Sequence, residues 1–210
     1  MRYEEFKAKV IGQPLISRQF LDLVEGVGPG FWVQFRRWVK AGKILKLRKG
    51  LYFLDPADRR INPSRLFIAG EIYSPSYVSM EYALSSYSLI PEKTADITCI
   101  TTKKTAAFKN ALGRFTYQHV KEKCFTGFHE VRDEAGLVYF MASPEKAAVD
   151  FIYLNRHKFK DNYAKALYDS FRFQNADILK KVKLFEYAKL FNDRKLILIV
   201  TALLRGLNNE

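Results

Sequence analysis

Within the first sixty residues, apolar and polar positions first alternate with the period of a helix and then with the period of a strand. Ser17 precedes apolar residues within 20–24, so we expect it to cap a helix that ends at Gly26. Residues 28–30 read Gly-Pro-Gly and break the chain. A second helix is predicted over residues 31–41, because at about 100° per residue its apolar positions fall in one arc. That arc holds the core residues Phe31, Trp32, Phe35, Trp38 and Val39.

The period changes to two after Gly42, which we expect to end the second helix in a left-handed conformation. Residues 45–48 alternate leucine with a basic residue, 49–50 form a Lys-Gly turn, and 51–54 run back as an apolar strand. Two helices followed by a basic hairpin are the order of a winged helix-turn-helix. In that arrangement the second helix enters the major groove, and the hairpin lies against the backbone or minor groove.

A polar stretch with two prolines, residues 55–63, predicts a boundary between two domains, residues 1–60 and 61–210. Helical patterns follow at residues 66–73 and 80–87. The second domain is then expected to contain four strands, because β-branched and alternating segments occur at residues 97–101, 114–120, 125–131 and 137–141.

The chain returns to helices at Ser143, where serine, proline and glutamate form a strong helix start. Two more helices are predicted over residues 176–191 and 193–207. The sequence therefore predicts an α+β fold, in which an N-terminal winged helix-turn-helix precedes a mixed domain with a small sheet and C-terminal helices.

The net charge of +13 indicates a polyanionic partner, and the distribution of the charge along the chain indicates which segment would bind it. Residues 1–60 hold 13 Lys and Arg against six Asp and Glu, and no acidic residue occurs from Gly26 to Leu54. A second basic run, at Lys180, Lys181 and Lys183, is interpreted as the solvated face of a helix, with a second contact to nucleic acid or a toxin as the alternative.

Seven cations in the acid-free segment are the predicted contacts to double-stranded DNA. Arg36 and Arg37 are expected to read bases, with Gln34 beside them, because Arg and Gln can bond base edges. The other five are expected to contact the phosphate backbone: Lys40, Lys43, Lys46, Arg48 and Lys49. Plainer readings stay open for each residue, since helices commonly carry a solvated cationic face and a basic hairpin can protect a sheet edge from aggregation.

Other kinds of site find little support in the sequence. The compact acidic groups, residues 4–5 and 133–134, are interpreted as a helix start and a turn rather than nuclease ligands. His119, Cys124 and His129 lack a fourth ligand and a zinc-type spacing. Because no phosphate-binding glycine loop or nucleophile elbow occurs either, we expect no enzyme activity, metal or cofactor.

The sequence also predicts a cytoplasmic protein without a membrane partner. Its longest apolar stretch, residues 196–204, is well short of the roughly 20 residues that cross a bilayer. The first residues carry Glu4 and Glu5 and lack a hydrophobic signal core. Cys99 and Cys124 are expected to be free thiols in a reducing compartment.

Several segments, in the same order along the chain, resemble the AbiEi family of type IV antitoxins. The clearest is Tyr-Val-Ser-Met-Glu-Tyr-Ala-Leu-Ser-Ser-Tyr-Ser-Leu-Ile-Pro-Glu at residues 77–92, which is similar to the segment after the winged helix. Residues 42–52 resemble the wing of that family, 100–103 and 113–115 its strand region, and 142–147 its following helix start.

The resemblance covers roughly residues 15–155 and implies a transcriptional autorepressor that binds inverted repeats at its own promoter. It also implies an antitoxin that opposes a nucleotidyltransferase-type toxin encoded beside it, without a stable complex between the two proteins. Two other classes stay open on the residues alone. One is an enzyme or enzyme-modulating domain that acts on RNA or nucleotides and docks through the basic N-terminus, and the other is a protein-interaction module.

Overall fold

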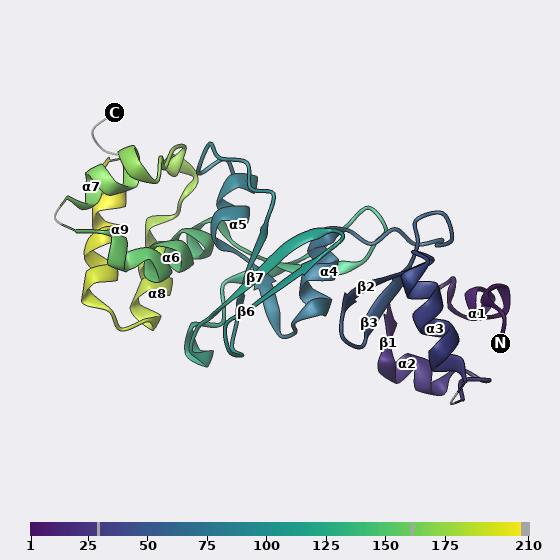
Figure 1. The fold of residues 1–210 in the computed structure, drawn as a ribbon. Coiled ribbons are helices and arrows are strands. Elements are labelled where there is room, and N and C mark those ends of the chain that lie inside the picture. Colours follow the sequence, from purple (N-terminus) through teal and green to yellow (C-terminus); the bar gives the residue numbers. More distant parts are fainter. Residues whose placement is uncertain (29, 161, 207–210) are drawn as a thin grey trace.

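The computed structural model of the protein describes residues 1–28, 30–160 and 162–206. Within these ranges the chain forms a mixed α+β fold with one sheet of three strands and one of six. The molecule is elongated, with the small sheet and the first helices at one end, the larger sheet in the middle and the last helices at the other end (Figure 1). The predicted α+β class is confirmed.

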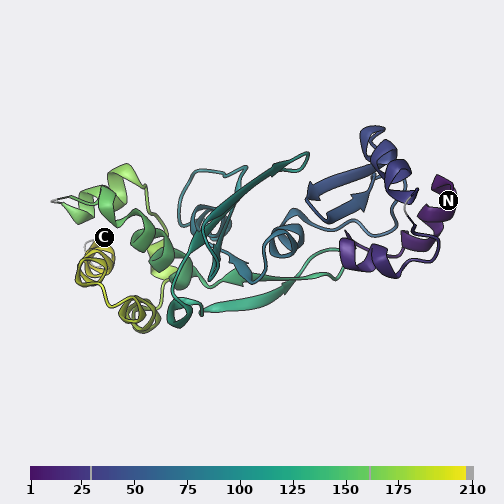
Figure 2. The same cartoon turned by 60° about the horizontal axis from the view of Figure 1, so that its bottom comes forward.

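We call residues 1–54 the N-terminal module. Its three strands pair in the order β1-β3-β2, and the sheet lies with the first helices at the N-terminal end of the molecule (Figure 2). Buried residues of α1, α2 and α3 share one core cluster with residues of this sheet. In chain order the elements are α1 (Tyr3–Val10), β1 (Ile16–Ser17), α2 (Arg18–Leu23), α3 (Phe31–Lys40), β2 (Ile44–Arg48) and β3 (Leu51–Leu54).

Local signals place α2, α3 and the hairpin close to where the sequence predicts them, whereas β1 was not predicted. The Ser17 hydroxyl accepts a hydrogen bond from the backbone N of Phe20 at 3.0 Å and so caps α2. Gly42 has φ of +77° and follows the last residues of α3, as expected of a left-handed terminator. The helix α2 is shorter than predicted and ends at Leu23, before the glycine at position 26.

An aromatic cluster forms the core of the N-terminal module. The ring of Phe6, from α1, lies within 5.2–5.9 Å of the rings of three α3 residues, measured between centroids. Those residues are Phe31, Phe35 and Trp38, all buried. Because the aromatic arc of α3 packs inward, its polar arc is turned to solvent.

The larger sheet has the strand order β6-β7-β5-β4-β9-β8, in which β5 with β7 and β4 with β9 are parallel pairs. The helices α4 (Arg65–Ile72) and α5 (Met80–Ser86) flank it (Figure 1). Its strands are β4 (Ser76–Val78), β5 (Ile97–Thr101), β6 (Ala106–Asn110), β7 (Gly113–His119), β8 (Phe128–Arg132) and β9 (Val138–Ala142).

The prediction of four strands in this sheet was incomplete, because β4 and β6 are also part of it. β4 has only three residues, all buried, so it shows no alternation. β6 reads Ala-Ala-Phe-Lys-Asn, in which alanine and asparagine are poor strand formers. The strand predicted from residue 125 begins later, at Phe128, because Glu122–Cys124 form a 3-10 turn and Gly127 has φ of +80°.

The last third of the chain is helical. Ser143 caps α6 (Pro144–Asn155) by accepting from the backbone N of Lys146 at 3.2 Å, as predicted. The helix predicted from residue 176 begins at 181 after a separate 3-10 turn, and the predicted end at Leu207 lies outside the described residues. The other elements are η2 (Arg156–Lys158), α7 (Tyr163–Lys165), η3 (Ala166–Ser170), η4 (Ala176–Ile178), α8 (Lys181–Leu190) and α9 (Arg194–Gly206).

A fully buried ion pair within α6 is linked to the larger sheet through hydroxyl groups. The Lys146 ammonium pairs with the Asp150 carboxylate, and both side chains have no exposed surface. The hydroxyls of Tyr77 and Ser79 each donate to Asp150 Oδ2 at 2.9 Å. Burial raises the pKa of Asp150, while the ammonium and the two hydroxyls oppose that shift.

The hairpin of the N-terminal module also packs on the larger sheet. Leu47, Leu51 and Phe53 are buried in the core cluster that includes this sheet, rather than in the aromatic cluster of α1 and α3. Asn110, at the end of β6, donates from Nδ2 to the backbone O of Leu47 at 3.2 Å. One face of the hairpin therefore packs the N-terminal module against the middle of the molecule.

Candidate nucleic-acid interface

The outward face of α3 carries the four polar residues that the sequence assigns to it. Phe35 and Trp38 are buried beneath the helix. Arg36 donates from Nε to the backbone O of Trp32 at 3.2 Å, one turn earlier in α3. Val33 shares the outward face and is 47% exposed. The polar residues exposed there are Gln34, Arg36, Arg37 and Lys40.

Arg18, which the sequence interpretation missed, connects the start of α3 with the hairpin turn. Its guanidinium lies 3.8 Å from the centroid of the Trp32 ring, and its backbone N donates to the Gly50 O at 2.8 Å. Its Nε also pairs with Asp22 at 3.0 Å, with both side chains about half exposed. No local sequence signal marks this role, because the contact with Trp32 depends on how α2 packs against α3.

Lys46 lies on the same side of the small sheet as α3. It is paired in register with Tyr52 on β3, and residues directly opposite each other in antiparallel strands point to the same face. The Tyr52 ring contacts Phe35 of α3 edge-on, with 4.9 Å between centroids. Since Lys46 is exposed, its ammonium extends from this face into solvent.

Arg48 and Lys49 lie instead where the hairpin meets the larger sheet. The register between β2 and β3 shifts between Lys46 and Arg48, and Leu47 is buried against the larger sheet. Arg48 and Lys49 are exposed and line a cleft between the hairpin turn and the end of α4. The hairpin therefore presents its cations on two sides, one toward α3 and one toward the rest of the protein.

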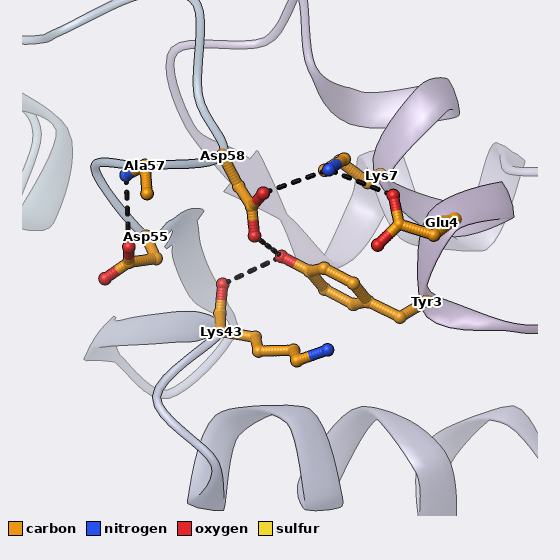
Figure 3. Close-up of polar contacts among 7 residues, drawn as sticks. All are labelled: Tyr3, Glu4, Lys7, Lys43, Asp55, Ala57 and Asp58. Carbon is orange, nitrogen blue, oxygen red and sulfur yellow. Dashed lines mark hydrogen bonds and ion pairs between the residues drawn. The ribbon is translucent and has the colours of Figure 1, made fainter.

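Lys43 lies apart from the other predicted contacts, beside α1 (Figure 3). Its ammonium is 4.4 Å from the centroid of the Tyr3 ring, and its backbone O accepts from the Tyr3 hydroxyl at 3.2 Å. The same hydroxyl donates to Asp58 Oδ2 at 2.7 Å, and Lys7 donates to Asp58 Oδ1 at 3.0 Å. The hydrogen bonds from Tyr3 and Lys7 lower the pKa of Asp58, so Lys43 stands next to an ionised carboxylate.

The cations of the acid-free segment, between Gly26 and Leu54, form no ion pairs within the described residues. An exposed cation without a carboxylate neighbour attracts anions from solution. The cations of the N-terminal module that do pair lie before this segment: Arg2, Lys7, Lys9 and Arg18.

The other chemistry-bearing residues do not converge. Cys124 is buried, with its Sγ 3.4 Å from the Leu190 O, whereas His119 and His129 are exposed on different strands. Across the part of the chain that the structure describes, no three such side chains are placed to hold a metal. Asp133 accepts backbone hydrogen bonds from Ser64 and from its own turn, so its carboxylate stabilises a loop.

Comparison of the sequence with models of known protein families finds no match, and comparison with curated proteins finds none either. Among the residues that the structure describes, no helix combines the length and the apolar character that a membrane crossing requires.

Proposed function

We propose that residues 1–60 form a winged helix-turn-helix that binds double-stranded DNA, and that the protein is a sequence-specific transcriptional repressor. The observation that carries the proposal is the outward face of α3, whose cations have no acidic partner and adjoin Arg18 and the hairpin. Helix α3 has the order and the aromatic anchoring expected of a helix that enters the major groove. Repression would follow from occupation of the promoter and needs no covalent step.

Residue roles follow from where the side chains lie. Arg36, Arg37 and Gln34 are the proposed base readers, and Val33 adds an apolar contact of the kind that recognises a thymine methyl group. The proposed backbone contacts are Arg18, Lys40, Lys46, Arg48 and Lys49. Lys43 has a smaller part in this proposal, because its ammonium lies against Tyr3 and near Asp58.

A binding titration on a selected duplex tests this proposal. Sequences enriched from a random duplex pool by the full-length protein supply the site, and a scrambled duplex is the reference. The variant with Arg36→Ala and Arg37→Ala should lose most of the preference for the selected duplex, at about 10- to 100-fold for each base contact.

Lys181→Ala with Lys183→Ala is the matched control, because it removes the same charge from exposed positions on α8 at the opposite end of the molecule (Figure 1). If the α3 variant and the control kept equal preference for the selected duplex, the proposed reading face would be wrong. Equal and large loss of binding in both variants would indicate that net charge alone drives association.

The antitoxin role is a further part of this proposal and is supported by the similarity of residues 15–155 to AbiEi-type antitoxins. In this view residues 61–210 are the antitoxin-like domain, and the promoter carries inverted repeats that two copies occupy. Where the neighbouring gene encodes a nucleotidyltransferase, its expression should arrest growth and co-expression of this protein should restore it. Neither protein should retain the other during purification. If the protein without substitutions failed to restore growth, the antitoxin role would be contradicted.

A further inference from the structure

A cleft of about 400 Å³ lies between the hairpin turn of the N-terminal module and the central part of the protein. Two of its cations, Arg48 and Lys49, come from the hairpin, and a third, Lys103, comes from the loop between β5 and β6. The remaining walls come from the end of α4, the residues after it and β6: Glu71, Ile72, Tyr73, Ser74 and Phe108.

The loop holds Lys103 in a defined place. The Lys103 ammonium donates to the Ser74 O and lies 5.4 Å from the centroid of the Tyr73 ring. The backbone N of Lys103 donates to the Thr101 hydroxyl at 3.1 Å, and its backbone O is hydrogen-bonded to His119 Nδ1 at 3.1 Å. Because both ends of this residue are fixed, its charge is kept at the rim of the cleft.

The cleft is linked through the hairpin turn to the surface proposed for DNA. Arg36 contacts Trp32, Trp32 lies under the guanidinium of Arg18, and the backbone of Arg18 bonds to Gly50. Lys49 precedes that glycine and lines the cleft with Lys103. A path of direct contacts therefore runs from the outward face of α3 through the hairpin turn into the central part.

The balance of charge in the cleft favours an anion. Three exposed cations face one carboxylate, Glu71, and none of the four takes part in an ion pair within the described residues. Duplex DNA presents a negative charge about every 1.7 Å along its axis, so a backbone that passes the hairpin turn continues beside it for several phosphates.

We propose that this cleft binds the phosphate backbone of the same duplex that α3 reads, so that Lys103 extends the DNA contact beyond the N-terminal module. The inference rests on the proposed function. It assigns a phosphate-contacting residue to residues 61–142, which hold nine Lys and Arg against eight Asp and Glu and carry no DNA-binding motif. Glu71 opposes the bound backbone and limits the affinity of the cleft.

Two substitutions of opposite sign test the cleft. Lys103→Gln should lower affinity for selected and scrambled duplexes alike and reduce the slope of log K against log salt by about one. When salt is raised from about 50 to 200 mM, the affinity of the variant should therefore fall roughly three- to fourfold less than the affinity of the parent protein. Glu71→Gln should tighten binding of both duplexes by about two- to fivefold, since it removes a repulsion at the surface.

Controls with the same charge changes lie on α8, where Lys181 and Glu186 are exposed and far from the cleft. Lys181→Gln and Glu186→Gln should leave the salt slope unchanged. Thermal unfolding of each variant checks that Lys103→Gln folds, and Glu71→Gln provides the test if it does not.

The inference is overturned if Lys103→Gln and Glu71→Gln behave as their α8 controls while the α3 variant still loses sequence preference. If the α3 variant also kept its preference for the selected duplex, the proposed function would be overturned instead. Opposite shifts from the two cleft variants, with a changed slope for Lys103→Gln, support the cleft as a phosphate site.

Discussion

The N-terminal module and the larger sheet hold their cations in opposite ways. On α3 and the hairpin, cations are exposed and no carboxylate pairs with them. Beneath the larger sheet, Lys146 is fully buried and its charge is matched by Asp150 and supported by two hydroxyls. A buried charge needs its partner for the fold to persist, whereas an exposed unpaired charge contributes little to stability and remains free to bind an anion.

Substitution of Asp150 should change the free energy of unfolding more than any substitution of an exposed cation. Asp150→Ala leaves the Lys146 ammonium buried without a partner, so the free energy of unfolding should fall by about 3–5 kcal/mol. Denaturant titration followed by circular dichroism measures it. Lys146→Met with Asp150→Leu removes both charges and should recover most of the loss, the remainder coming from the hydroxyls of Tyr77 and Ser79. A small effect of Asp150→Ala alone would contradict the account of the buried pair.

On the exposed side, Lys46→Ala with Lys49→Ala should leave stability within about 0.5 kcal/mol of the parent. Both substitutions remove proposed phosphate contacts, so binding should weaken for every duplex and the salt slope should fall by about two. DNA-binding titrations at several salt concentrations measure both the affinity and the salt slope. A variant that loses preference for the selected duplex but keeps its slope would place these lysines on base edges instead.

Arg18 should have an intermediate effect, because it combines a stacking contact with a proposed phosphate contact. Arg18→Ala should weaken DNA binding by about two- to fivefold and destabilise the fold by about 0.5–1 kcal/mol through loss of its contact with Trp32. Asp22→Asn frees the guanidinium from its carboxylate and should strengthen binding. Parallel titrations of the two variants are the measurement, and changes of the same sign in both would exclude a direct role for Arg18.

Substitutions around Tyr3 should produce the smallest effects. Lys43→Ala should change DNA affinity by less than about twofold, since its ammonium lies apart from α3. Asp58 has a lowered pKa in the folded protein, so its contribution to stability is present above its unfolded pKa near 3.9 and is lost as the pH falls below it. Unfolding of the parent should therefore depend more on pH below about 5 than unfolding of Asp58→Asn, by at most about 1 kcal/mol. Identical acid profiles would contradict this linkage.

The sequence was a sufficient guide wherever the signal was local. The cap at Ser17, the helix over residues 31–40, the stop at Gly42 and the hairpin turn all follow from neighbouring residues, and the structure confirms them. The helix start at Ser143 belongs to the same group. These features depend on caps, periodicity and turn geometry, which act over a few positions.

Features that depend on distant contacts were beyond such reasoning. The buried strand β4 has no alternation, and β6 becomes a strand only through its partner β7. The alternation at residues 45–48 predicted a hairpin with a free basic face, but the register shift turns Leu47 into the larger core and Arg48 toward the cleft. Arg18 and Lys103 have no distinguishing sequence context, because their place in the candidate interface is set by tertiary packing.

The hydrogen bond from Asn110 to the backbone of Leu47, together with the apolar residues buried around it, leaves the hairpin little freedom to swing about the linker. If two copies bind inverted repeats as proposed, a DNA-binding module held in this way should tolerate few changes in the number of base pairs between the half-sites. Insertion of half a helical turn between them would set two copies on opposite sides of the duplex, and neither could swivel to restore their mutual approach.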